Sequence, residues 1–161
     1  MGVSSVLVAF GVRLLLVLIF LPFSALDKIL NHRGAVGQAS EAVDSTSIAT
    51  ALIAVGFLVE VIMSVGVVTG IADRAAAFIL AGYCGATAIF WKQFWTPGDF
   101  WTVGKSRARG LFWDFLKNFA LAGGFLLLAF GSDAAGVRRF WNHPLASSHP
   151  YDAPAASGLP L

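Results

Sequence analysis

The fold of this chain follows from one apolar stretch, Phe112-Trp-Asp-Phe-Leu-Lys-Asn-Phe-Ala-Leu-Ala-Gly-Gly-Phe-Leu-Leu-Leu-Ala-Phe-Gly131. It is long enough to cross a bilayer as a helix, which takes about 20 mostly apolar residues. Near its start it carries Asp114, Lys117 and Asn118, and on a helix these i, i+3 and i+4 positions share one face. A polar face at this place has to be directed toward protein or trapped water. The stretch therefore predicts a membrane helix with a polar end that packs against other helices.

The composition places the rest of the chain in the membrane as well. Hydrophobic residues make up 57% of the 161 residues and charged residues only 12%, and the mean hydropathy is +0.76. A soluble domain carries about 25% charged residues. The net charge of +2 is too small, and the basic residues are too scattered, to indicate a nucleic-acid partner. We therefore predict a single all-α domain that is integral to a lipid bilayer.

Four apolar segments predict a four-helix transmembrane bundle within residues 1–131. The first segment has no basic region before it and is longer than the apolar core of a signal peptide, so we expect an uncleaved span, kinked at Pro22. Residues 31–47 are predicted to be a polar loop. Residues 132–161, rich in Pro, Ala and Ser, are predicted to be an extended tail. The spans are expected at about residues 3–30, 48–70, 75–95 and 112–131.

An even number of spans places both termini on the same side of the membrane. The face that holds the first and third loops carries more lysine and arginine than the face that holds the termini, so the positive-inside rule places both termini outside the cytoplasm. The basic residues on the first face are Lys28, Arg33, Lys92, Lys105, Arg107 and Arg109, and those on the other are Arg74, Arg138 and Arg139.

Arg13 and Glu60 are predicted to form a buried ion pair. Counted from the terminal face, they lie about eight and ten residues along adjacent spans, which at 1.5 Å per residue is a depth of roughly 12–15 Å. An unpaired charge at that depth costs about 2.5–3.5 kcal/mol, so a bidentate arginine–carboxylate pair is expected. Two interpretations are open. The pair can be a staple that fixes the helix register, or the polar floor of a ligand pocket.

A second polar cluster, the loop-face cluster, is predicted where three spans end at the opposite face. Its members are Asp27, Lys28, Trp91, Asp114, Lys117 and Asn118. One interpretation is an aromatic belt with lysines that extend to the membrane surface. The other is an aromatic-lined site for a quinone headgroup or another amphiphile. Asp114 and Asn118 fit the second interpretation better, because neither side chain is long enough to reach far toward water.

The sequence predicts no metal site and no covalently bound cofactor. His32 lies in a predicted loop, and His143 and His149 lie in the predicted tail, so no two histidines face one another across spans. The single cysteine, Cys84, leaves no Cys-x-x-Cys pair or haem-attachment motif in these residues. There is no glycine-rich nucleotide fingerprint and no nucleophile–base pair. We expect no independent catalytic centre.

Three blocks of the sequence resemble the DoxX family of small four-helix membrane proteins. They are Arg13-Leu-Leu-Leu-Val-Leu-Ile-Phe20 with Ser24-Ala-Leu-Asp-Lys-Ile29, Glu60 with Thr69-Gly-Ile-Ala-Asp-Arg-Ala-Ala76, and Phe115-Leu-Lys-Asn-Phe-Ala-Leu-Ala-Gly-Gly124. They are similar to the first helix, the second helix with its turn, and the fourth helix of that family, and the resemblance extends over about residues 8–131. Where family members often have Gly-Gly after the glutamate, this chain has Met63 and Ser64.

The resemblance implies a small subunit of a membrane-bound oxidoreductase in a bacterial inner membrane, as in thiosulfate:quinone oxidoreductase. Such a subunit would bind quinone or anchor a redox partner. Arg13, Glu60, Lys117 and Asn118 carry over only as motif positions. Two alternatives are a purely structural subunit of a larger membrane assembly and a small transporter with Arg13–Glu60 as a gate. The absence of an internal repeat argues against the transporter.

Overall fold

The computed structural model describes residues 3–41 and 43–152, and in these residues the chain is helical, with turns and loops between helices and no strand. This confirms the all-α prediction. The first span consists of three consecutive elements, and three further helices are also long and apolar enough to cross a membrane. The elements are α1 (Val3–Val17), the π-helical turn η1 (Ile19–Ser24), α2 (Ala25–Leu30), α3 (His32–Ala39), α4 (Thr46–Thr69), α5 (Asp73–Trp91), α6 (Arg107–Phe130) and α7 (Ala134–Asn142).

The first span is kinked at the predicted place. Leu21, directly before Pro22, leaves the helical region with φ −119° and ψ 109°. A proline ring crowds the backbone of the preceding residue and drives it toward extended angles. The helix resumes as α2, and beyond the kink Ser24 and Lys28 face α4.

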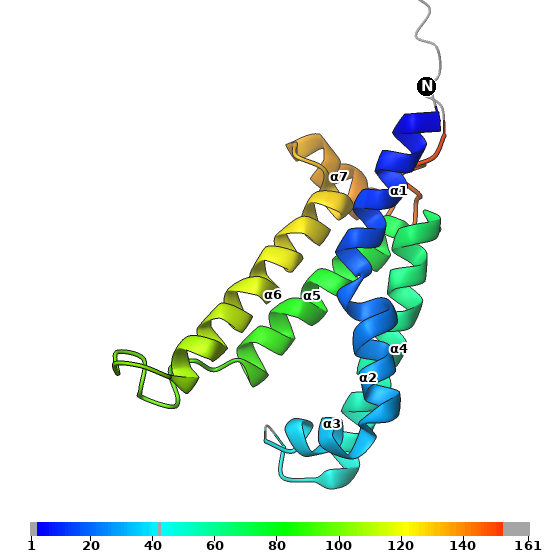
Figure 1. The fold of residues 1–161 in the computed structure, drawn as a ribbon. Helices are drawn as coiled ribbons and strands as arrows, with labels where there is room; N and C mark the ends of the chain where they lie inside the picture. The colour runs from blue at the N-terminus through cyan, green and yellow to red at the C-terminus, as the bar shows by residue number, and fades with distance from the viewer. Residues whose placement is uncertain (1–2, 42, 153–161) are drawn as a thin grey trace, which may run out of the picture.

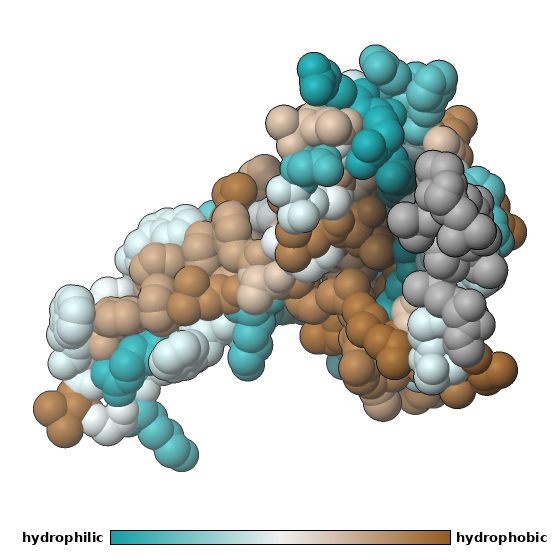
Figure 2. All heavy atoms as spheres, turned by 90° about the horizontal axis from the view of Figure 1, so that it is seen from above, coloured by the Kyte–Doolittle hydropathy of each residue, from teal (hydrophilic) through white to brown (hydrophobic). Residues whose placement is uncertain are grey.

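The helices form two pairs that meet at one end of the molecule. α5 and α6 lie side by side as one pair, and the first span packs along α4 as the other. The pairs meet near α7 and diverge toward the loop between α5 and α6 (Figure 1). Seen from above, the α5–α6 pair is an arm that extends away from the rest, with a largely hydrophobic surface (Figure 2). Such a surface suits contact with lipid.

The core lies where the two pairs meet. Its fully buried side chains include Val17 of the first span, Val67 of α4, Leu80 of α5 and Phe125 of α6. Small residues between them, such as Ala77 of α5, let the helix backbones approach closely. In the most apolar 18-residue window of each helix, the share buried inside the molecule is 6% for α6 and 33% for α5. α5 is therefore the most buried of the four spans, and α6 is the least buried.

The chain after Gly131 differs from the predicted extended tail. Residues 134–142 form α7, whose Phe140 is 2% exposed and packs against Phe78 and Phe130. The helix begins at a local signal that composition does not register, because the side chain of Asp133 accepts a hydrogen bond from the backbone N–H of Gly136. Similarly, the predicted loop at 31–47 contains α3. Residues 153–161 of the predicted tail lie outside the described residues.

Candidate functional site

Glu60, in the interior of α4, is the centre of a buried polar cluster. Its side chain is 2% exposed, and both carboxylate oxygens lie 2.8 Å from Nζ of Lys28. Oε1 also accepts hydrogen bonds from the hydroxyl of Tyr83 at 2.8 Å and from Oγ of Ser24 at 3.1 Å. We call these four residues the Glu60 site. It gathers an acid, an amine and a phenol in an apolar bundle.

Three segments of the chain build the Glu60 site. Ser24 and Lys28 stand one turn apart beyond the kink of the first span, and Nζ of Lys28 also donates to Oγ of Ser24 at 2.8 Å. Tyr83 comes from α5. It fits because Gly56 lies one turn before Glu60 on α4, where a Cβ atom would stand only 3.2 Å from the tyrosine oxygen. The site therefore depends on the kink and on one glycine.

A polar side chain without a partner lies one turn further along α4 from Glu60. The Oγ atom of Ser64 is fully buried and forms no hydrogen bond within the described chain. Cys84, also fully buried, follows Tyr83 on α5. A buried hydroxyl without a partner in the described chain therefore lies one helical turn from Glu60 on the same helix.

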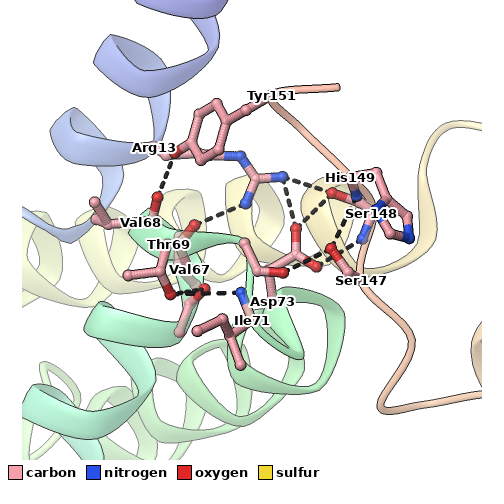
Figure 3. Close-up of polar contacts among 12 residues, drawn as sticks. Arg13, Val67, Val68, Thr69, Ile71, Asp73, Ser147, Ser148, His149 and Tyr151 are labelled. Atoms are coloured by element: carbon pink, nitrogen blue, oxygen red, sulfur yellow. Dashed lines mark hydrogen bonds and ion pairs between the residues drawn. The ribbon is translucent and has the colours of Figure 1, made fainter. Parts of the chain in front are cut away.

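The predicted Arg13–Glu60 pair is wrong. Arg13 is 5% exposed, as expected, but its Nη2 lies 2.7 Å from Oδ2 of Asp73, the first residue of α5 (Figure 3). Nη1 donates to the carbonyl of Val67 at 2.7 Å. The predicted pairing assumed straight helices and side chains that lie at the same depth as their own Cα atoms. In fact the long arginine side chain reaches the end of the bundle, and the kink brings Lys28 to Glu60.

A C-terminal strap, residues 147–151, completes the surroundings of Arg13 (Figure 3). Ser148 donates from its backbone N–H to Oδ1 of Asp73 at 2.8 Å and from its hydroxyl to Oδ2 at 2.5 Å. Its Oγ accepts a hydrogen bond from Nη2 of Arg13 at 2.8 Å. Ser147 and Tyr151 donate to the carbonyls of Gly70 and Val68 at the end of α4. The strap therefore ties the C-terminal region across the ends of α1, α4 and α5.

The predicted loop-face cluster is divided between the two helix pairs. Lys28 belongs to the Glu60 site, and Asp27 is exposed. The reason is the divergence of the pairs toward this end (Figure 1). On α6, Nζ of Lys117 lies 3.3 Å from Oδ1 of Asp114. The side-chain amide of Asn118 donates to the backbone carbonyl of Asp114 at 2.9 Å.

The α5–α6 members of the loop-face cluster do lie near one another. Nζ of Lys92 stands 3.9 Å from Oδ2 of Asp114, so the end of α5 meets the start of α6. The side chain of Lys117 is 72% exposed, which leaves it free to move. The indole nitrogen of Trp91 is buried and has no hydrogen-bond partner among the residues the structure describes. Of these residues, Asp114 and Lys117 are the most exposed, with side chains 44% and 72% exposed.

The sequence interpretation missed three residues that complete the two buried sites: Asp73, Tyr83 and Ser148. Tyr83 could have been found, because a tyrosine hydroxyl inside an apolar span needs a partner and Glu60 is the obvious acceptor. Asp73 lies between the spans predicted at 48–70 and 75–95, where a carboxylate is within reach of a long basic side chain. Ser148 carries no local signal. Its partners are 75 and 135 residues away in the sequence.

Among residues 3–41 and 43–152 there is no group of three or more His, Cys, Asp or Glu side chains that could hold a metal ion. No family model, curated protein or solved structure matches the chain. The similarity to the DoxX family therefore rests on the three sequence blocks alone.

Proposed function

We propose that this chain is a membrane subunit of an oxidoreductase or electron-transfer complex, and that the Glu60 site binds a quinone headgroup. The observation that carries the proposal is the carboxylate of Glu60, held at 2.8 Å by both Lys28 and Tyr83. Ionisable groups inside membrane spans are costly and mark ligand or proton pathways more often than ordinary packing. The DoxX resemblance supports the same role, and with it a place in a bacterial inner membrane.

The chemistry of the Glu60 site suits the two forms of a quinone. Lys28 and Tyr83 are hydrogen-bond donors, which a quinone carbonyl requires, and a carboxylate accepts the hydroxyl proton of a quinol. The side chain of Lys28 is 13% exposed and that of Glu60 is 2% exposed. Lys28 is therefore the more accessible member of the pair, and a ligand would meet it before Glu60.

A structural accessory role is the second candidate, and a different observation favours it. Of the four apolar windows, that of α6 has the smallest buried share, 6%, so part of this helix surface is available to a neighbouring subunit. The four charges of the two buried pairs also have partners of opposite sign. In this role both pairs would be staples that hold the helices in register.

The experiment is a quinone-binding assay on protein purified in mild detergent, read by solvent extraction and by titration with a short-chain quinone. Tyr83→Phe removes one donor and keeps the ring, so we expect quinone affinity to fall about tenfold, which corresponds to roughly 1.4 kcal/mol. Lys117→Ala, on the exposed face of α6, is the matched control and should bind as the wild type does.

Two results would contradict the proposal. If Lys117→Ala loses quinone and Tyr83→Phe keeps it, the ligand site is the loop-face cluster. If the wild type binds no quinone and is recovered only inside a larger membrane assembly, the chain is a structural subunit.

A further inference from the structure

The guanidinium of Arg109, at the start of α6, holds the loop between α5 and α6 in one shape. The guanidinium of Arg109 donates to the backbone carbonyls of Phe100 at 2.8 Å and Thr102 at 2.6 Å, and also to that of Gly104. Gly104 has φ +90°, a conformation that residues with a side chain rarely adopt. One side chain thus binds three backbone carbonyls of the loop and stabilises this conformation.

Asp99 fixes the same loop to the start of α6. Its carboxylate accepts hydrogen bonds from the backbone N–H groups of Arg107 at 2.7 Å and Ala108 at 2.9 Å. These N–H groups have no partner within the helix, so the aspartate satisfies them. The hydrogen bond from Ala108, together with that from Arg107, holds the pKa of Asp99 below its usual range. The loop therefore stays anchored at neutral pH.

This ordered loop presents apolar side chains outward instead of burying them. Trp101 is 90% exposed and Val103 is 97% exposed. The neighbouring Phe100 does pack inward, with its ring centroid 5.4 Å from that of Phe112. The exposure of Trp101 and Val103 is thus a property of the loop's shape. It leaves two large apolar groups that nothing in the described chain covers.

Basic side chains follow directly after these apolar groups. Lys105 and Arg107 are both exposed, and neither forms an ion pair within residues 3–41 and 43–152. The acidic residue of the loop, Asp99, is turned to the backbone of α6. The tip of the loop is therefore apolar with a positive flank.

We propose that the loop around Trp101–Arg107 is a hook that binds anionic phospholipid headgroups of the bilayer that α5 and α6 cross. Its position at the ends of two spans places the tip at the membrane surface. Tryptophan prefers that boundary, where Trp101 and Val103 would enter the acyl region. Lys105 and Arg107 would then meet lipid phosphates, and the preformed loop loses little conformational freedom on binding. This proposal is independent of the quinone proposal.

The test places a fluorophore at the tip of the loop. A Val103→Cys variant is labelled with an environment-sensitive dye, while Cys84 is fully buried and does not compete. The protein is reconstituted into bilayers that carry a nitroxide quencher either on an anionic or on a zwitterionic lipid headgroup. We expect the anionic lipid to quench more strongly at equal mole fraction. The control label is at Ser132→Cys, an exposed position after α6 at the other end of that helix, where we expect no preference.

Removal of the charges tests the role of Lys105 and Arg107. In a Lys105→Gln/Arg107→Gln background, we expect the association preference for anionic over zwitterionic lipid to fall about fivefold per charge, or roughly 1 kcal/mol each. The melting temperature should not change, since both side chains are exposed. A preference that survives the double substitution would overturn the proposal. A label at position 103 that neither lipid quenches would also overturn it. The same holds for a label that is buried only in native membranes, since that would mean that a protein covers the tip.

Discussion

The two buried ion pairs, Arg13–Asp73 and Lys28–Glu60, connect the same parts of the chain but differ in their other hydrogen-bond partners. Each joins a base on the first span to an acid on the following hairpin, and both acids are at most 2% exposed. Around Arg13 the remaining hydrogen bonds come from a backbone carbonyl and from the strap. Around Glu60, in the part of the chain that the structure describes, they come from the side chains of Ser24 and Tyr83.

The difference follows from position along the bundle. At a helix end, backbone carbonyls and N–H groups are unpaired and can satisfy a charge. In the interior of a span the backbone is already hydrogen-bonded to itself, so a charge there depends on side chains. Side chains can change rotamer and exchange partners, whereas the end of a helix is fixed. This is why we propose that the Arg13–Asp73 pair closes the bundle and that the Glu60 site is the one that binds a ligand.

The largest effect is expected from breaking the fixed pair. Asp73→Asn should destabilise the protein by about 3–5 kcal/mol, because it leaves the guanidinium of Arg13 buried without a counter-charge. Unfolding by a denaturant in detergent, followed by circular dichroism, measures the loss. The matched control is Arg13→Met/Asp73→Leu, which removes both charges and should recover most of the stability. A double variant as unstable as the single one would show that lost packing, and not the unpaired charge of Arg13, causes the loss of stability.

A smaller effect is expected from Glu60→Gln. The amide keeps an acceptor for Tyr83 and Ser24, and Lys28, at 13% exposed, can turn toward the surface. We expect a loss of about 1–3 kcal/mol, the range for a buried polar group left unsatisfied. The same unfolding assay measures it. A loss equal to that of Asp73→Asn would contradict the distinction between an exchangeable and a fixed site.

The smallest effect is expected from Ser148→Ala in the strap. The change removes one donor to Asp73 and one acceptor of Arg13, but the serine is only partly buried and water can replace it. We expect a loss of about 1 kcal/mol. Limited proteolysis gives a sharper readout, since cleavage in the strap should become faster while α7 stays intact. Unchanged cleavage would show that the strap is held by other contacts.

The sequence was sufficient to predict the fold class and the membrane-spanning character, because hydropathy over about 20 residues is a local property. It also identified Arg13 and Glu60 as buried charges. It could not pair them, since the direction of the kink at Pro22 decides which side chains of the first span face α4. The sequence also could not show that the two helix pairs diverge, which divides the loop-face cluster.

The part played by the C-terminal region was beyond prediction for a different reason. A stretch rich in proline and serine has no periodicity to indicate where it lies. The contact of Ser148 with Asp73 spans 75 positions of the sequence, so no local pattern marks it. The Asp133 cap of α7 is a local signal that average composition hides.

The measurement that tests this account most directly is a pair of double-mutant cycles that share Arg13→Met. One cycle combines it with Asp73→Leu and the other with Glu60→Gln, and the free energy of unfolding is measured for each variant. We predict a coupling energy above about 2 kcal/mol between Arg13 and Asp73, and one within about 0.5 kcal/mol of zero between Arg13 and Glu60, as for residues that share no partner. Strong coupling between Arg13 and Glu60 would contradict the separation of the two sites.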